Sequence, residues 1–121
     1  SVVAAIVRES DRVLVAKRPP GGQWAGLWEF PYTRIEGAES EADVLRGHLE
    51  EAFGLVVKVG EEVSALTYGV MNRRVALTAY ACEKQAGRVA AADHVETRWG
   101  RLDELGDLPM PSPHRSLAEH I

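Results

Sequence analysis

One helix, expected between residues 40 and 53, constrains the fold most, because it is the only long helical pattern before the C-terminal region. Ser40 can cap its first turn, with Asp43 three residues later. Apolar side chains at helical spacing form a single stripe, made of Leu45, Leu49, Ala52 and Phe53. Gly54 follows where many helices stop in left-handed backbone. The pattern therefore predicts a helix that packs one face against an apolar partner.

The partner is expected to be a β-sheet, because β-branched apolar runs precede and follow the helix. We expect a hairpin from residues 2–7 and 12–17, strands at 55–59, 63–70, 74–82 and 96–102, and a turn at 69–73. Residues 87–94 are expected to be a connection, 103–108 a turn or short helix, and 113–120 a closing helix. No regular strand-helix-strand alternation is present, so the fold class is α/β: an α/β/α sandwich with a mixed sheet, one main helix and a short C-terminal helix.

Length and charge restrict the class of protein. A chain of 121 residues with 45% hydrophobic side chains is expected to form one domain, residues 1–121. It contains no apolar run of membrane-spanning length, so we expect a cytoplasmic protein with no membrane partner. With 14 basic and 18 acidic side chains the net charge is −4, which gives no electrostatic signature of a protein that grips nucleic acid alone. Because Ser1 already belongs to an expected strand, we expect a fragment of a longer protein.

Cys82 is the only cysteine, so the chain has no internal disulfide and no thiol cage for zinc. We expect a packed core thiol.

Residues 30–40, followed by Leu49-Glu50-Glu51-Ala52-Phe53-Gly54-Leu55, resemble the loop-helix-loop signature of the Nudix family. The resemblance implies a Nudix-like fold. In that family, glutamates of the loop and helix bind a divalent metal and hydrolyse nucleoside diphosphate derivatives. Carboxylates three and four residues apart share one helix face, and clustered hard oxygens hold Mg²⁺ against a pyrophosphate.

The chain departs from that signature in the helix. Aligned on Gly54, the family's arginine and three glutamates fall on Gly47, His48, Glu51 and Ala52, so only one of the four is retained. The loop glutamate survives as Glu39. Tyr32 and Thr33 stand where the family usually has two glycines. We interpret the remaining acidic residues mainly as a solvated helix face.

Motifs outside the helix are similar to the C-terminal domain of MutY-type adenine DNA glycosylases. They are Lys17-Arg18-Pro19, Gly26-Leu27-Trp28-Glu29-Phe30-Pro31, Arg98-Trp99 and Leu108-Pro109-Met110-Pro111-Ser112-Pro113-His114-Arg115. The resemblance implies a C-terminal fragment that cuts nothing and has no catalytic residue, metal or cofactor of its own. It helps recognise 8-oxoguanine opposite adenine in double-stranded DNA, while an N-terminal glycosylase domain of the same chain, with an iron-sulfur cluster, flips and removes the adenine.

The recognition loop of those glycosylases, usually Phe-Ser-His, falls on Val70, Met71 and Asn72. Arg73 and Arg74 would then neutralise phosphates. The alternative is a plain hairpin tip, with Asn72 present for turn geometry and the two arginines solvated.

Three functions follow from these patterns. The first is DNA repair by base excision, with this chain as the non-catalytic lesion-recognition domain of an adenine DNA glycosylase, a hydrolase. The second is a stand-alone Mg²⁺-dependent Nudix hydrolase of oxidised nucleotides such as 8-oxo-dGTP. Its carboxylates would be Glu36, Glu39, Glu50 and Glu51. The third is a protein-interaction module on a Nudix scaffold.

Overall fold

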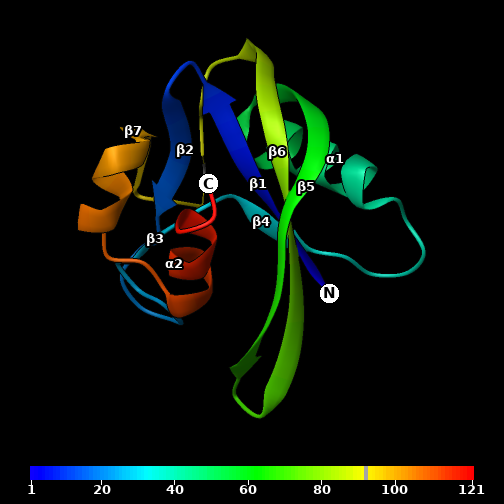
Figure 1. Cartoon of the computed structure of the whole chain (residues 1–121), viewed down its shortest axis with the longest axis vertical. Coiled ribbons are helices and arrows are strands. Elements are labelled where there is room, and N and C mark those ends of the chain that lie inside the picture. Colours follow the sequence, from blue (N-terminus) through cyan, green and yellow to red (C-terminus); the bar gives the residue numbers. More distant parts are fainter. Residues whose placement is uncertain (92) are drawn as a thin grey trace.

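A computed structural model describes residues 1–91 and 93–121, and within them seven strands form one sheet (Figure 1). The elements, in chain order, are β1 (Val2–Glu9), β2 (Arg12–Lys17), β3 (Trp28–Glu29), β4 (Tyr32–Arg34), α1 (Glu41–Phe53), β5 (Leu55–Val70), β6 (Arg73–Gly87), β7 (Glu96–Arg101), the 3₁₀ helix η1 (Leu102–Asp107) and α2 (Ser112–Ala118). Residue 92, in the expected connection 87–94, lies outside the described residues.

The sheet is mixed, which confirms the sequence prediction. Its main order is β3-β2-β1-β6-β5, and β4 and β7 pair in addition with β1 and β2. The β1 and β6 strands run parallel, with Val2 opposite Leu77 and Arg8 opposite Glu83. The other pairs are antiparallel.

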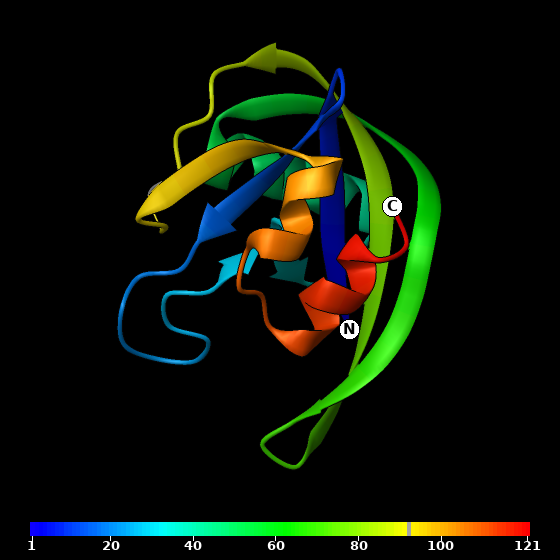
Figure 2. The same cartoon turned by 60° about the vertical axis from the view of Figure 1, so that its left-hand side comes forward.

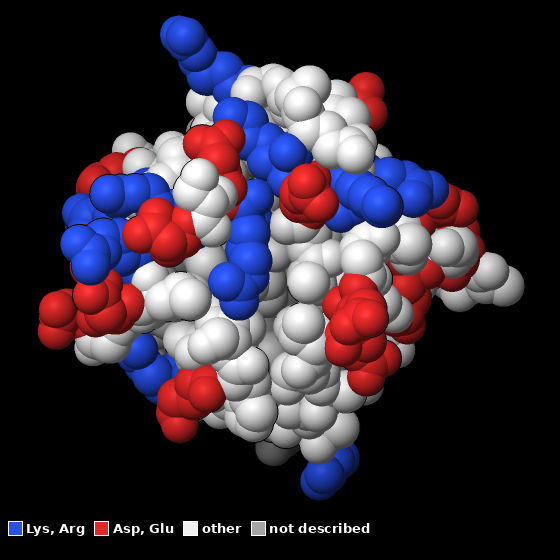
Figure 3. All heavy atoms as spheres, turned by 45° about the horizontal axis from the view of Figure 1, so that its top comes forward, with Lys and Arg blue, Asp and Glu red and all other residues white. Residues whose placement is uncertain are grey.

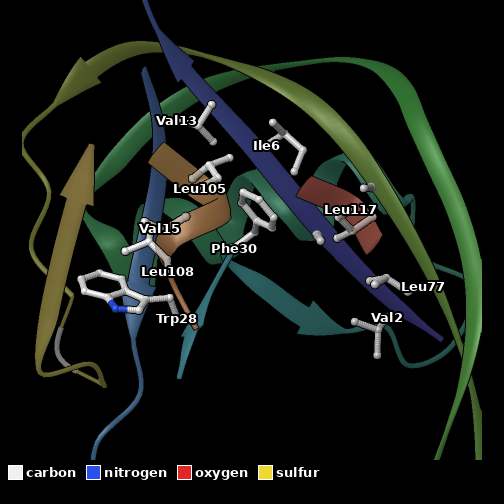
Figure 4. Packing of buried hydrophobic residues seen from close by; sticks show 12 residues of the cluster. Val2, Ile6, Val13, Val15, Trp28, Phe30, Leu77, Leu105, Leu108 and Leu117 are labelled. Atoms are coloured by element: carbon white, nitrogen blue, oxygen red, sulfur yellow. The ribbon is translucent and has the colours of Figure 1, made fainter. Parts of the chain in front are cut away.

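The central strand β1 is buried on both faces, so apolar cores form on both sides of the sheet. Val3, Ala5 and Val7 belong to one core with the α1 stripe residues Leu45, Leu49 and Phe53. Val2, Ala4 and Ile6 belong to the other, with Phe30, Leu105 of η1 and Leu117 of α2 (Figure 4). Side chains alternate across a strand, so a continuous apolar run fits a strand covered on both faces. The α/β/α sandwich is confirmed.

The main helix begins and ends as the sequence predicts. The Ser40 Oγ accepts a hydrogen bond from the Asp43 backbone N–H at 3.4 Å. Gly54 has φ 68°, and its N–H donates to the Glu50 carbonyl at 3.1 Å. In the part of the chain that the structure describes, neither α1 nor any other helix is long and apolar enough to cross a membrane.

Cys82 is buried in the core beneath α1, as expected for a packed thiol. Burial raises its pKa to about 12, so the reactive thiolate is scarce at neutral pH.

Two features of the sheet differ from the sequence prediction. Residues 55–59 and 63–70 form one continuous strand, β5. The register of its pairing with β6 shifts between Val59 and Ser64, and these shifts accommodate the polar residues between the two apolar runs without ending the strand. The short strands β3 and β4 were not among the strands that the sequence predicted. They are held by pairing with β2 and β1 rather than by a local pattern.

The β5-β6 hairpin extends beyond the body of the sandwich (Figure 2). Its two-residue turn, Met71 and Asn72, has positive φ at both positions, 48° and 67°. This is the backbone that two-residue hairpins favour, because its twist matches that of the strands. The predicted turn is confirmed.

Candidate functional site

Backbone hydrogen bonds hold the loop between β2 and β3, and this loop brings Trp24 beside Tyr68 of β5 and His114 of α2. The Arg18 N–H donates to the Leu27 carbonyl at 3.0 Å, and the Gly26 N–H donates back to Arg18 at 3.2 Å. The Arg18 Nε also donates to the Gln23 carbonyl at 3.0 Å. Trp24 has φ 59°, an uncommon backbone for a bulky residue that persists only where its surroundings fix it.

Trp24 borders a cavity of about 380 Å³, which we call the aromatic groove. Its main walls are the side chains of Trp24, Tyr32, Tyr68, Arg34, Arg73 and Arg74. The Trp24 and Tyr68 ring centroids lie 6.2 Å apart, tilted by 43°. Aromatic faces stack on bases, and guanidinium groups pair with phosphates. This groove therefore has the chemistry to hold a planar base and an anionic group together.

The buried His114 ring packs against aromatic side chains that line the groove. It is 1% exposed, and its Nδ1 accepts a hydrogen bond from the Phe30 N–H at 3.0 Å. Its ring lies 6.0 Å from Phe30, 5.2 Å from Tyr32 and 6.0 Å from Trp24, centroid to centroid. Burial lowers the pKa of His114 to about 4, so the ring is neutral at pH 7. It acts as a fixed acceptor that ties α2 to the segment leading into β4.

A second cavity of about 350 Å³ lies on the α1 side of the sheet, and we call it the Glu29 pocket. Its polar walls are Arg18, Glu29, His48, Asp93 and His94. The Glu29 side chain is only 3% exposed. Its Oε2 lies 2.8 Å from the His94 Nε2 and 3.4 Å from the Arg18 Nη1. No described residue forms a hydrogen bond with its Oε1.

Phe53 forms an apolar wall of the Glu29 pocket and contacts both histidines. Its ring centroid lies 5.8 Å from that of His48 and 5.6 Å from that of His94. Burial lowers the pKa of His48, and nearby Glu51 partly opposes that effect. Two imidazoles and a buried carboxylate therefore share one cavity.

The four glutamates that the sequence suggested as Mg²⁺ ligands do not lie around one point in the structure. Glu36 and Glu39 lie exposed in the loop before α1, and Glu50 and Glu51 are exposed on the helix. Among the described residues, no three carboxylate, imidazole or thiol side chains are placed to hold one metal ion. The donor set of this chain therefore does not fit a Mg²⁺ site of the expected kind.

The residues expected to read a lesion lie at the hairpin end of the aromatic groove. Val70, Met71, Arg73 and Arg74 line the groove, and Met71 is 85% exposed at the turn. Asn72 occupies the second turn position, as the turn-geometry interpretation expected. Lysines and arginines are interspersed with acidic residues on the face shown in Figure 3.

Comparison with known proteins agrees with this architecture. A family model described as "NUDIX domain" matches residues 2–120. The chain belongs to the Nudix family. Curated Nudix relatives include the CTP pyrophosphohydrolase of Escherichia coli K12, 33% identical over 90% of this chain and 81% of that protein. The putative 8-oxo-dGTP diphosphatase 2 of Mycobacterium tuberculosis is 31% identical over 88% of this chain and 77% of that protein.

Solved structures of other proteins superpose over almost the whole chain. The solution structure of the E. coli ORF135 protein has a TM-score of 0.80 and 31% identity, covering 98% of this chain and 85% of that one. The MutT protein of Methanosarcina mazei Go1 has a TM-score of 0.81 at 21% identity, covering 98% of this chain and 88% of that one, and this likeness concerns the fold alone.

These findings correct the functional prediction. The interpretation as a non-catalytic glycosylase domain is wrong, because the curated Nudix relatives are named as nucleotide pyrophosphohydrolases or diphosphatases and this chain spans most of their length. The motifs that suggested a glycosylase, such as Leu27-Trp28-Glu29-Phe30-Pro31, lie within the segment that the Nudix family model matches. The expected iron-sulfur cluster rests on the glycosylase interpretation and loses its basis with it.

Sequence reasoning missed the Glu29 pocket. Glu29 and His94 are 65 residues apart in the sequence, so no local pattern connects them. One signal was present: Glu29 is an acidic residue inside the apolar run Leu27-Trp28-Glu29-Phe30. A carboxylate in such a run is expected to be buried and therefore to need a partner.

Proposed function

We propose that the chain binds a nucleoside triphosphate in the aromatic groove and hydrolyses one of its phosphoanhydride bonds, with substrates of the class of CTP or 8-oxo-dGTP. The substrate class comes from the names of its relatives. The observation that carries the proposal is the groove itself, because it combines the rings of Trp24 and Tyr68 with three arginines in a cavity of about 380 Å³.

The groove supplies both contacts that a nucleotide needs. Trp24 and Tyr68 present aromatic surface for a base, and the neutral ring of His114 holds Trp24 in an edge-on contact. Arg34, Arg73 and Arg74 come from β4 and β6 and place positive charge along the same cavity, although the whole chain carries −4. A nucleotide is therefore attracted locally and oriented by its base.

The chemical step is not assigned to a resident metal, because Glu36, Glu39, Glu50 and Glu51 are not gathered around one point. In this proposal the chain binds and orients the nucleotide, which is supplied as its Mg²⁺ complex, and a side chain near the phosphates accepts a proton from water.

Binding and hydrolysis are measured separately on the 121-residue chain. CTP, 8-oxo-dGTP and dGTP are each incubated with the protein, and released pyrophosphate and phosphate are quantified. Binding is measured by calorimetry with non-hydrolysable analogues of the same nucleotides. Turnover of CTP or 8-oxo-dGTP supports the proposal. Neither binding nor turnover of any of the three overturns it.

Two variants locate the binding site. Removal of a stacking ring costs about 1–3 kcal/mol, so Trp24→Ala should weaken binding by roughly 5- to 150-fold. Trp99→Ala is its control, because Trp99 packs against the core on the α1 side. Arg34→Gln should weaken binding less, and Arg46→Gln, at an exposed position of α1, should not weaken it. Equal effects of Trp24→Ala and Trp99→Ala would exclude the groove.

A further inference from the structure

The Glu29 carboxylate is buried and only partly paired. It lies on β3 between Trp28 and Phe30, both buried, and pairs by backbone with Ala16 of β2. Burying a carboxylate costs several kcal/mol unless every oxygen is paired. Here Oε2 has two partners, while no described residue forms a hydrogen bond with Oε1. A buried acid with an unpaired oxygen calls for an explanation, and a role in a catalytic site is one.

Glu29 determines which ring nitrogen of His94 carries the hydrogen. A carboxylate can only accept, so at 2.8 Å the His94 Nε2–H donates to Glu29 Oε2. In the neutral ring the lone pair then lies on Nδ1, the nitrogen that can take a proton. The Phe53 ring, 5.6 Å away, limits how the imidazole can turn. A buried carboxylate, an oriented imidazole and an adjoining cavity form the arrangement that general-base catalysis uses.

The cavity beside His94 has room for a phosphate group, and the Arg18 guanidinium is the positive charge on its wall, opposed by the carboxylates of Glu29 and Asp93. Its volume is about 350 Å³, and the Arg18 guanidinium lines it together with His48. Arg18 contacts Glu29 at 3.4 Å and remains 31% exposed, so its positive charge reaches the pocket as well as the carboxylate. Tyr32 lines both this pocket and the aromatic groove. The two cavities therefore adjoin at Tyr32, and in this inference the phosphates of a nucleotide whose base occupies the groove lie on the His94 side of that residue.

We propose that His94 is the general base of the hydrolysis, and that Glu29 is the positioning residue that orients it; this rests on the proposed function. The His94 Nδ1 takes a proton from water as the water oxygen forms a bond to phosphorus. The bridging P–O bond breaks, and its electron pair stays on the leaving phosphate. The proton on His94 then passes to the leaving group or to solvent, which restores the neutral ring.

The test uses CTP and 8-oxo-dGTP with the 121-residue chain and its variants. His94→Ala should lower kcat by about 10²- to 10⁴-fold, with KM changed little, because general-base catalysis contributes that much. Added imidazole should restore part of the lost rate. His120→Ala is the matched control, because His120 is an exposed histidine near the C-terminus whose Nδ1 lies 2.7 Å from the Ser116 carbonyl oxygen, and it does not line the Glu29 pocket. Thermal melting of each variant confirms folding.

Glu29→Gln tests the positioning role. The glutamine can still accept from His94 but carries no charge, so kcat should fall less than in His94→Ala and the pH profile of kcat should shift. A melting temperature lowered with an unchanged pH profile would mean that Glu29 is only structural.

The outcomes separate this inference from the proposed function. If the wild-type chain turns over either nucleotide and His94→Ala keeps kcat within twofold, or loses it without any imidazole rescue, the His94 assignment is overturned while the hydrolase proposal stands. If the wild-type chain binds both nucleotides without turnover, the His94 assignment is overturned and only the binding groove remains. Loss of kcat with imidazole rescue supports it.

Discussion

The aromatic groove and the Glu29 pocket lie against the same short segment, β3 and β4, yet they differ in chemistry. The groove has rings and three arginines along its walls and is bordered by the exposed β5-β6 turn. The Glu29 pocket has two imidazoles, an arginine and two carboxylates beneath α1. Tyr32 is the side chain that lines both.

The difference indicates a division of roles within one small fold. Surface for binding is built from side chains on strands and a loop, where aromatic rings tolerate exposure. The groups that we propose for proton transfer lie in a pocket with a buried acid, where electrostatic interactions are stronger than in water. Four predictions test this comparison, from the largest expected effect to the smallest.

Phe53→Ala is expected to destabilise the fold most and to damage the Glu29 pocket selectively. Phe53 is 1% exposed, so truncation should cost about 3–5 kcal/mol in the free energy of unfolding, measured with urea. Val56→Ala, at a residue 45% exposed, is the control and should change that free energy by less than about 0.5 kcal/mol. Nucleotide affinity of the folded variant should fall less than in Trp24→Ala, because the base is held in the groove; an equal loss would show that groove and pocket are not separate.

His114 is expected to make the groove side of the fold sensitive to acid. Its pKa in the folded chain, about 4, is below the ordinary value of 6.5, so the unfolded chain binds the proton first. The stabilisation is complete above pH 6.5 and is lost as the pH falls toward 4. Since one pKa unit corresponds to about 1.4 kcal/mol, the free energy of unfolding should fall by roughly 2 kcal/mol between pH 7 and pH 5.

His114→Asn provides the control for that pH dependence, because its amide can still accept from the Phe30 N–H but does not titrate. Its urea unfolding should change less between the two pH values. An equal slope in both proteins would place the acid sensitivity elsewhere.

Alanine substitutions of Gly47, within α1, and Gly54, at the end of α1, should change the free energy of unfolding in opposite directions. They test the helix that forms one wall of the Glu29 pocket. Gly54→Ala should destabilise by about 1–2 kcal/mol, because its φ is 68° and a Cβ would lie 3.3 Å from the Arg88 carbonyl. Gly47→Ala should stabilise by about 0.4–1 kcal/mol, because nothing lies within 4 Å and alanine favours helix. Chemical unfolding of both variants is the measurement, and the same sign for both would contradict the helix assignment.

Met71→Asn should have the smallest effect, at the rim of the groove. Its φ of 48° suits asparagine better than methionine, so we expect stabilisation by about 0.5 kcal/mol in thermal or urea unfolding. Nucleotide affinity should remain within twofold, because the side chain is 85% exposed. A larger loss of affinity would extend the groove to the turn.

The sequence predicted those parts of the fold that depend on local patterns. The α1 stripe, its Ser40 cap and its Gly54 stop are local features, and each is present in the structure. The strands β3 and β4 were missed, because two and three residues carry no recognisable alternation and form only by pairing with distant strands. The two apolar runs of β5 were separated for a similar reason, since only pairing with β6 carries the strand through its irregular middle.

The candidate site likewise contains features that the sequence predicted from local patterns and features that it did not predict. The departures from the Nudix signature at Gly47, His48 and Ala52 were visible in the sequence, because a helix fixes the spacing of its residues. The interpretation as a glycosylase domain was wrong, because short motifs shared by several Nudix proteins do not distinguish among their activities.

By itself, the sequence determined a Nudix α/β sandwich, a main helix with most of its family carboxylates replaced, and a two-residue turn flanked by arginines. Only the tertiary structure decided which side chains meet. The chain returns toward β2 before it enters β7, and this return brings His94 to Glu29. The parallel pairing of β1 with β6 places the β5-β6 hairpin so that Tyr68 meets Trp24. Such contacts join residues 44 to 65 positions apart, and their existence depends on the packing of the whole chain rather than on any local pattern.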